Sequence, residues 1–158
     1  MPPYRGLRID RDTSQAHSGK ACIRYTSSDE GFVQARVGVC QVLGRSLAGK
    51  RVRLSAWVKT DSLRGGMTSI RLYCNSLSRG MIQSEPGQSF DLTNDWSPVS
   101  FEMDVPPDAV GTWAWFAYTV PATGTVYYDD AALEVLGPAS TAAPARAGAR
   151  PAVKIPAP

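Results

Sequence analysis

Hydrophobic and polar residues alternate along most of the chain with the period of two that is typical of β-strands. In the clearest segment, residues 51–59, small and branched apolar residues fall on one face, and Trp57 shares the other face with charged and polar residues. Residues 70–75 alternate in the same way, with Arg71 and Tyr73 on the polar face. The pattern predicts seven strands, at residues 21–25, 32–42, 51–59, 68–75, 99–105, 112–120 and 125–135.

Clusters of turn-forming residues separate these segments. Glycine, proline, asparagine and aspartate gather at residues 18–20, 47–50, 64–66, 93–95, 106–108 and 121–124. No stretch of ten or more residues holds the 3.6-residue period of a helix. Many short strands with frequent turns predict an all-β fold, an antiparallel β-sandwich of the jelly-roll type.

The composition changes at Gly137. Residues 137–158 contain five prolines and eight alanines, with no acidic and no aromatic residue. Such a segment buries too little apolar surface to offset its ordering entropy, so we expect an extended, irregular tail after a single domain at residues 6–136. The tail is interpreted as a linker or solvated end, or as a docking arm that orders on a protein partner through residues 138–158.

The charge distribution excludes several classes of protein. Residues 1–136 carry fourteen acidic and fourteen basic side chains, so the net charge of +3 belongs to Arg146, Arg150 and Lys154. A neutral domain does not provide the basic surface that nucleic acids require. No apolar run is long enough for a membrane-spanning helix, and the N-terminal residues lack the apolar core of a signal peptide.

Three cysteines, Cys22, Cys40 and Cys74, lack the paired spacing of a zinc site. They are interpreted either as three small thiols or, in an oxidising compartment, as one disulfide and one free thiol. The sequence does not determine which two would pair.

Four phrases occur in order along the chain: residues 15–21 (QAHSGKA), 49–59 (GKRVRLSAWVK), 92–100 (LTNDWSPVS) and 124–134 (GTVYYDDAALE). Together they resemble jelly-roll carbohydrate-binding modules of families 4, 9 and 22, within the galactose-binding-like superfamily. The resemblance covers roughly residues 6–136 and implies an extracytoplasmic, non-catalytic module that binds a polysaccharide or glycan. Such modules usually open with a further strand, for which only Met1–Arg5 stand upstream here.

Aromatic rings that stack on the apolar face of a sugar, with neighbouring planar polar groups, are the chemistry expected for such a site. Trp113 and Trp115 share one face of their strand, and only this pair or the alternating Phe116 and Tyr118 can face outward. The resemblance places Trp57 on the concave sheet face, which favours Trp57, Tyr73 and one of these aromatic pairs as the binding platform. Trp96, at the entry to a strand, is expected in the core. The predicted ligand-binding residues are Trp57, Arg71, Tyr73 and Trp115.

The resemblance also implies one structural calcium ion, held by an aspartate of the last strand and by oxygens near residues 17–20. Asp129, Asp130, Asp10 and Asp12 are the candidate ligands, since calcium takes six to eight oxygens. The alternative is that these carboxylates cap turns. Adjacent residues of a regular strand point to opposite faces, so Asp129 and Asp130 should not act as a catalytic pair, and His17 is the sole histidine.

Two functions follow from the sequence. The first is a non-catalytic carbohydrate-binding module whose sugar the sequence does not specify. The second is a structural or accessory subunit of a larger, membrane-associated assembly, with the sandwich as a rigid body and the tail as a docking arm.

Overall fold

The computed structural model describes residues 6–28, 35–44, 47–86, 88, 90–120 and 122–140. Within these ranges the chain forms strands joined by turns, and every pairing between strands is antiparallel. This confirms the all-β prediction. The strands are β1 (Leu7–Asp12), β2 (Cys22–Ser27), β3 (Ala35–Val42), β4 (Lys50–Ser76), β5 (Gly80–Ser84), β6 (Phe90–Asp104), β7 (Ala109–Val120) and β8 (Thr123–Pro138).

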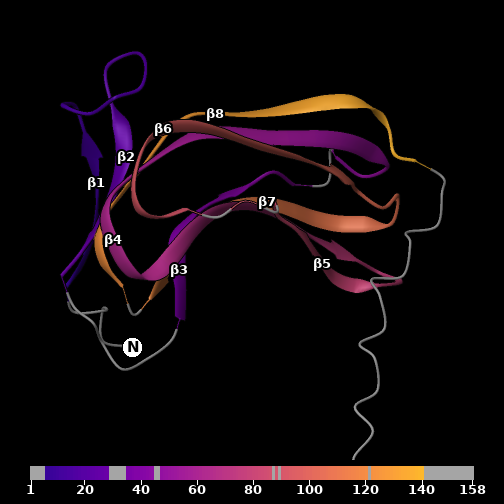
Figure 1. Cartoon of the computed structure of the whole chain (residues 1–158). Coiled ribbons are helices and arrows are strands. Elements are labelled where there is room, and N and C mark those ends of the chain that lie inside the picture. The colour runs from indigo at the N-terminus through magenta and orange to yellow at the C-terminus, as the bar shows by residue number, and fades with distance from the viewer. Residues whose placement is uncertain are drawn as a thin grey trace, which may run out of the picture.

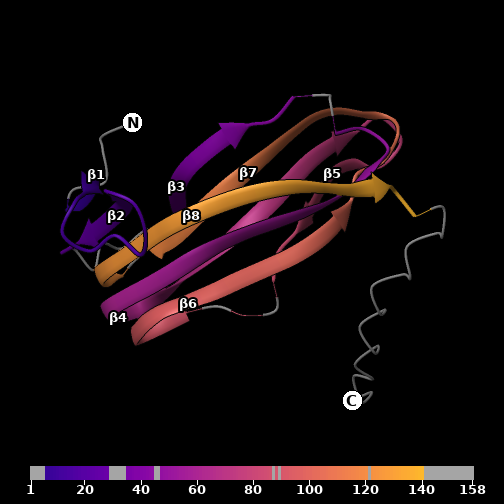
Figure 2. The ribbon, with the colours of Figure 1, turned by 90° about the horizontal axis from the view of Figure 1, so that it is seen from above.

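The long strand β4 connects two layers (Figures 1 and 2). Its first part pairs with β6 on one side and β8 on the other, and its last part pairs with β7 and β5. β2 extends the first layer by pairing with β8, and β3 extends the second by pairing with β7. The hydrogen-bonded sheet therefore curls over itself into a sandwich.

The core lies between the two layers. Val52, Leu54 and Val58 from the first part of β4 and Ile70 and Leu72 from its last part belong to one cluster of buried side chains. These residues are at most 2% exposed. The alternation read from the sequence therefore describes both halves of β4 correctly, since the apolar positions point inward in each.

Two of the predicted turns are strand residues. Residues 64–66 lie within β4, where the chain passes from one layer to the other, and residues 93–95 lie within β6. Ser62 and Gly65 have positive φ angles of 54° and 73°, and the pairing register shifts between Thr60 and Thr68. The turn-forming residues therefore make bulges in a continuous strand instead of ending it.

Two short strands were not predicted. β1 pairs with β2 over its whole length, from Leu7↔Ser27 to Asp12↔Cys22, so a strand does precede the loop at residues 13–21. β5 pairs with the end of β4, from Leu72↔Ser84 to Ser76↔Gly80. β1 carries charged residues at four of its six positions, and β5 has only five residues, so the period-two pattern is weak in both.

The described chain ends just beyond β8. The Ala139 backbone N–H donates to the Gly49 carbonyl oxygen at 2.8 Å, and the Ser140 N–H donates to Asp104 Oδ1 at 3.1 Å. Residues 141–158, which include most of the predicted docking arm, lie outside the described residues. No helix in the described ranges is long and apolar enough to cross a membrane.

Candidate functional site

The outward side of the second layer carries a group of aromatic rings. Arg71 and Tyr73 alternate with the buried Ile70, Leu72 and Cys74 on β4, and Trp113 and Trp115 alternate with buried residues on β7. The pairings Arg71↔Trp115 and Tyr73↔Trp113 bring the four side chains together. We call this surface, defined by Arg71, Tyr73, Trp113 and Trp115, the aromatic face.

The rings of the aromatic face pack against one another. Tyr73 stacks on Trp113 with 5.7 Å between ring centroids and an interplanar angle of 10°, and it meets Trp115 at 5.6 Å and 50°. Tyr73 is only 5% exposed although it is not in the core cluster, because the two tryptophans cover it. The half-buried Trp113 and Trp115 therefore offer the accessible ring surface.

Two nitrogen atoms on this face have no hydrogen-bond partner within the described chain. They are Nη1 of Arg71 and Nε1 of Trp115, and both are buried. Buried donors without a partner are uncommon, because leaving one unsatisfied costs about 1–3 kcal/mol. Both atoms are N–H donors, so the group that would satisfy them must supply acceptor oxygens.

A glycine on β3 makes room for Trp115. A Cβ atom built at Gly38 would lie 2.5 Å from Trp115 Nε1 and 2.0 Å from the Phe116 carbonyl oxygen. Any side chain at this position would therefore displace the indole or the β3–β7 pairing. The absence of a side chain lets the indole lie close to the β3 backbone.

The charge of Arg71 is balanced by Glu85, which follows β5. Arg71 Nη2 forms an ion pair with Glu85 Oε2, one residue beyond the end of β5, and Arg71 Nε donates to Ser69 Oγ at 3.2 Å. The Arg71 side chain is 7% exposed and that of Glu85 is 37% exposed. The arginine thus lies beneath a carboxylate that remains open to solvent.

Trp57 lies on the outward side of the other layer, across the core from the aromatic face. It alternates with the buried Ala56 and Val58, and its ring stacks on the imidazole of His17 at 3.9 Å and 17°. Trp96 is half-buried on the same side, with its ring 5.5 Å from His17 and 6.4 Å from Tyr127. The expectation that Trp96 lies in the core is wrong, since it packs outside the sheet against the loop at residues 13–21.

Asp129 and Asp130 hold that loop against β8. Asp129 Oδ2 accepts the backbone N–H groups of His17 and Ser18 at 2.8 and 3.1 Å. Asp130 accepts a hydrogen bond from Ser18 Oγ at 2.5 Å and pairs with His17 Nδ1 at 2.7 Å. The expectation that the two carboxylates point to opposite faces is wrong, because Asp130 has a φ of 48° at a bulge between the Ser55 and Trp57 pairings.

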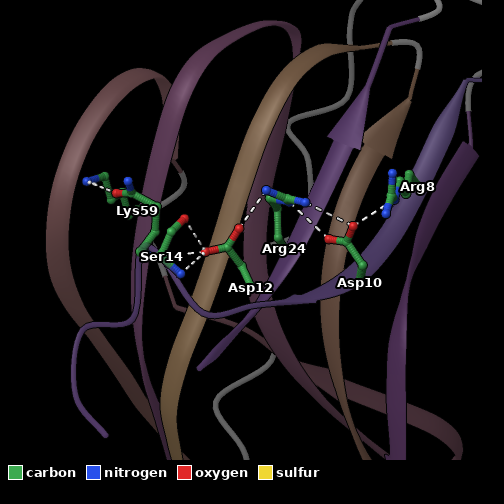
Figure 3. Close-up of polar contacts among 7 residues, drawn as sticks. Arg8, Asp10, Asp12, Ser14, Arg24 and Lys59 are labelled. Atoms are coloured by element: carbon green, nitrogen blue, oxygen red, sulfur yellow. Dashed lines mark hydrogen bonds and ion pairs between the residues drawn. The ribbon is translucent and has the colours of Figure 1, made fainter. Parts of the chain in front are cut away.

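Asp10 and Asp12 bind an arginine (Figure 3). Arg24 lies between them, with Nε 2.9 Å from Asp10 Oδ1 and Nη1 2.5 Å from Asp12 Oδ2. Asp12 Oδ1 also accepts hydrogen bonds from Ser14 and from the Gln15 N–H. The hydrogen bonds from Ser14 hold the pKa of Asp12 below its ordinary value, and the hydrogen bond from Arg24 does the same for the pKa of Asp10.

The four aspartates therefore form two separate clusters. Their oxygens accept N–H and O–H donors of the protein, and the cationic group between Asp10 and Asp12 is a guanidinium. Calcium requires several oxygens that converge on one point. In the described ranges no three His, Cys, Asp or Glu side chains are grouped so that they could hold a metal ion, and this arrangement does not fit a calcium ion shared by these four aspartates.

The three cysteines are free thiols. Cys22 and Cys74 are buried, and burial raises the pKa of Cys22 to about 11 and raises that of Cys74. Cys40 is exposed on β3 and pairs in register with Trp115, so it borders the aromatic face.

The structure thus brings together three of the four predicted ligand-binding residues, Arg71, Tyr73 and Trp115, and places Trp57 on the opposite side. It adds Trp113, which the sequence offered as a partner of Trp115. It also adds Glu85 and Gly38, which no sequence pattern indicated, because their roles depend on β5 lying beside β4 and β3 lying beside β7.

Comparisons with known proteins support the fold. No family model matches the chain, and no curated protein matches it in sequence. Solved structures do match. The C-terminal family 22 carbohydrate-binding module of Clostridium thermocellum Xyn10B has a TM-score of 0.63 at 16% identity, covering 85% of both chains.

Other matches agree with this one. A xylan-binding domain of family 22 has a TM-score of 0.62 at 15% identity, covering 82% of each chain, and a family 4 module has 0.55 at 20%, covering 82% of this chain and 77% of that one. The chain also matches 18% of the enzymatically active domain of a bacteriophage CBA120 tailspike protein. The chain therefore has the fold of the carbohydrate-binding modules of families 4, 16 and 22.

Proposed function

We propose that the chain is a non-catalytic glycan-binding module that holds a sugar against the aromatic face. The observation that carries this proposal is that two half-buried tryptophans, Trp113 and Trp115, share this face with Arg71. Two buried N–H donors of the face, Arg71 Nη1 and Trp115 Nε1, have no partner within the described chain. Pyranose rings combine an apolar face, which stacks on indole, with hydroxyl and ring oxygens that accept hydrogen bonds. The accessible indole surface therefore matches the apolar face of a pyranose.

Similar modules point to the first ligand to try. Two of the matched structures are described as xylan-binding, so xylan is the first polysaccharide to use as a probe, followed by a neutral β-glucan. We also propose that the protein acts outside the cytoplasm, where polysaccharides of this kind are found. The chain would then bind the glycan without chemically altering it.

Affinity electrophoresis through gels that contain each polysaccharide tests the proposal. We expect retardation of the wild type and a loss of affinity of roughly tenfold or more in Trp115→Ala, because removing a central aromatic contact typically costs that much. Trp96→Ala is the matched control, since it removes a half-buried tryptophan from the opposite side. Wild-type protein that migrates freely in every gel would contradict the proposal.

The rate at which a reagent modifies the Cys40 thiol gives an independent test of where the sugar binds. It is the exposed thiol beside Trp115, whereas Cys22 and Cys74 are buried, so a thiol reagent should modify it first. A sugar on the aromatic face should slow this modification. Equal rates with and without a polysaccharide that retards the protein would place the sugar elsewhere on the molecule.

The alternative, an accessory subunit that docks through its tail, depends on residues 141–158, which lie outside the described residues. Absence of glycan binding together with co-purification of a larger complex would favour it. Size-exclusion chromatography of the native extract separates the two functions, because a lone 17.0 kDa species would argue against assembly.

A further inference from the structure

Among the residues whose side chains are described, one charged pair lies at the aromatic face, Arg71 with Glu85, and its arrangement bears on which glycans can bind. Of the strand residues that alternate onto this face and whose side chains are described, Arg71 alone is charged. The others are apolar, aromatic or neutral polar: Gly38, Cys40, Val42, Ser69, Tyr73, Asn75, Met81, Gln83, Gly111, Trp113, Trp115 and Ala117. Glu85, which follows β5, supplies the opposite charge.

We propose that Glu85 is a specificity-determining residue, which neutralises and covers Arg71 so that the aromatic face rejects acidic polysaccharides. This inference rests on the proposed function and adds the class of glycan that the face excludes. Without Glu85, a buried guanidinium would face the site with two of its nitrogen atoms, Nη1 and Nη2, unpaired.

Arginine pairs strongly with carboxylates because two parallel N–H groups meet two oxygens. In the wild type the Glu85 carboxylate is already bound to Arg71 Nη2. The carboxylate of a uronic acid would therefore be repelled by the negative charge of Glu85. Nη1 is buried and has no partner within the described chain. The pair therefore presents a carboxylate to the site, which repels anionic sugars and not neutral ones.

The position of Glu85 is fixed by local sequence. Pro86 follows it, and the residue before a proline is held in an extended conformation. Gln83 pairs with Tyr73 and Ser84 pairs with Leu72, so the next residue reaches the level of Arg71. The carboxylate is thus carried to the guanidinium by the register of β5.

The experiment compares polygalacturonate with a neutral polysaccharide in affinity gels. We expect the wild type to be retarded by the neutral gel alone. Glu85→Ala should uncover Arg71 and gain about tenfold or more in affinity for polygalacturonate, with a gain that shrinks as salt rises. Glu85→Gln, which keeps the size of the side chain and removes its charge, should gain in the same direction.

Two further variants make the result specific. Glu134→Ala removes one exposed carboxylate from the other layer, so it matches the change in net charge and should gain nothing. Arg71→Gln added to Glu85→Ala should abolish the gain. Far-UV circular dichroism checks that each variant folds.

The inference and the proposed function fail in different ways. Wild-type protein that binds polygalacturonate as well as the neutral glycan would overturn the role of Glu85 and leave glycan binding intact. The same conclusion holds if both Glu85 variants behave like Glu134→Ala. Wild-type protein that binds no neutral polysaccharide would instead overturn the proposed function.

Discussion

The hydroxyl group of Tyr25 joins three strands through one buried side chain. The Val39 N–H of β3 donates to it at 2.8 Å, and it donates to the Phe116 carbonyl oxygen of β7 at 3.1 Å. Burial raises the pKa of Tyr25 to about 12, so the hydroxyl keeps its proton at neutral pH. A side chain of β2 therefore completes the hydrogen bonding between β3 and β7 beside Gly38.

Tyr25→Phe should destabilise the protein by about 1–3 kcal/mol, because the part-buried Val39 N–H and the buried Phe116 carbonyl oxygen both lose this hydrogen-bond partner. Urea unfolding measures the change. Tyr127→Phe is the control, since the Tyr127 hydroxyl makes no hydrogen bond in the described chain. Equal stability of Tyr25→Phe and wild type would show that water or backbone shifts replace the lost hydroxyl.

Among the elements, the loop at residues 13–21 depends on carboxylates that bind its start and its middle. Asp12 accepts hydrogen bonds from its first residues, and Asp129 and Asp130 bind His17 and Ser18. The hydrogen bonds from Ser18 and His17 hold the pKa of Asp130 below the ordinary value of 3.8. This lowered pKa predicts how the stability of the protein changes in acid.

A carboxylate whose pKa is lower in the folded state stabilises the protein above its unfolded pKa, and this contribution disappears as the pH falls through the folded pKa. Asp130→Asn should therefore lower the melting temperature at about pH 6, and its difference from wild type should shrink towards about pH 3. Asp91→Asn, which changes an exposed carboxylate on β6, should differ little from wild type at either pH. A constant difference for Asp130→Asn would show that its effect is not ionic.

The sequence predicted these elements unevenly. Alternation found β4, β7 and β8, and it grouped Trp113 with Trp115 on one face of β7. It did not show which face of β7 points outward, because both faces of that strand are apolar. It missed that residues 51–59 and 68–75 are one strand, since glycines suit bulges as well as turns. It also could not show that the layers place Trp57 and Tyr73 on opposite sides, because that depends on long-range pairing.

For the whole molecule, the contacts of the aspartates predict a result for metal removal. Arg24 supplies the positive charge between Asp10 and Asp12, and N–H donors bind Asp129. We therefore expect excess chelator to leave the melting temperature unchanged. A bound ion at a hundredfold excess over its dissociation constant would contribute about 2.7 kcal/mol, so a fall of several degrees would reveal a calcium site.

The course of β4 has an evolutionary consequence. The inward-facing positions step by two up to Thr60, then by three to Leu63 and by five to Thr68, after which steps of two resume. The two odd steps together span an even number of residues, so the side chains keep the same alternation. The strand therefore enters the second layer with Arg71 and Tyr73 still outward. An insertion or deletion of one residue between positions 60 and 68 would turn the aromatic face into the core and the core into the surface. Related proteins that keep this face should therefore differ in the length of this segment by even numbers of residues.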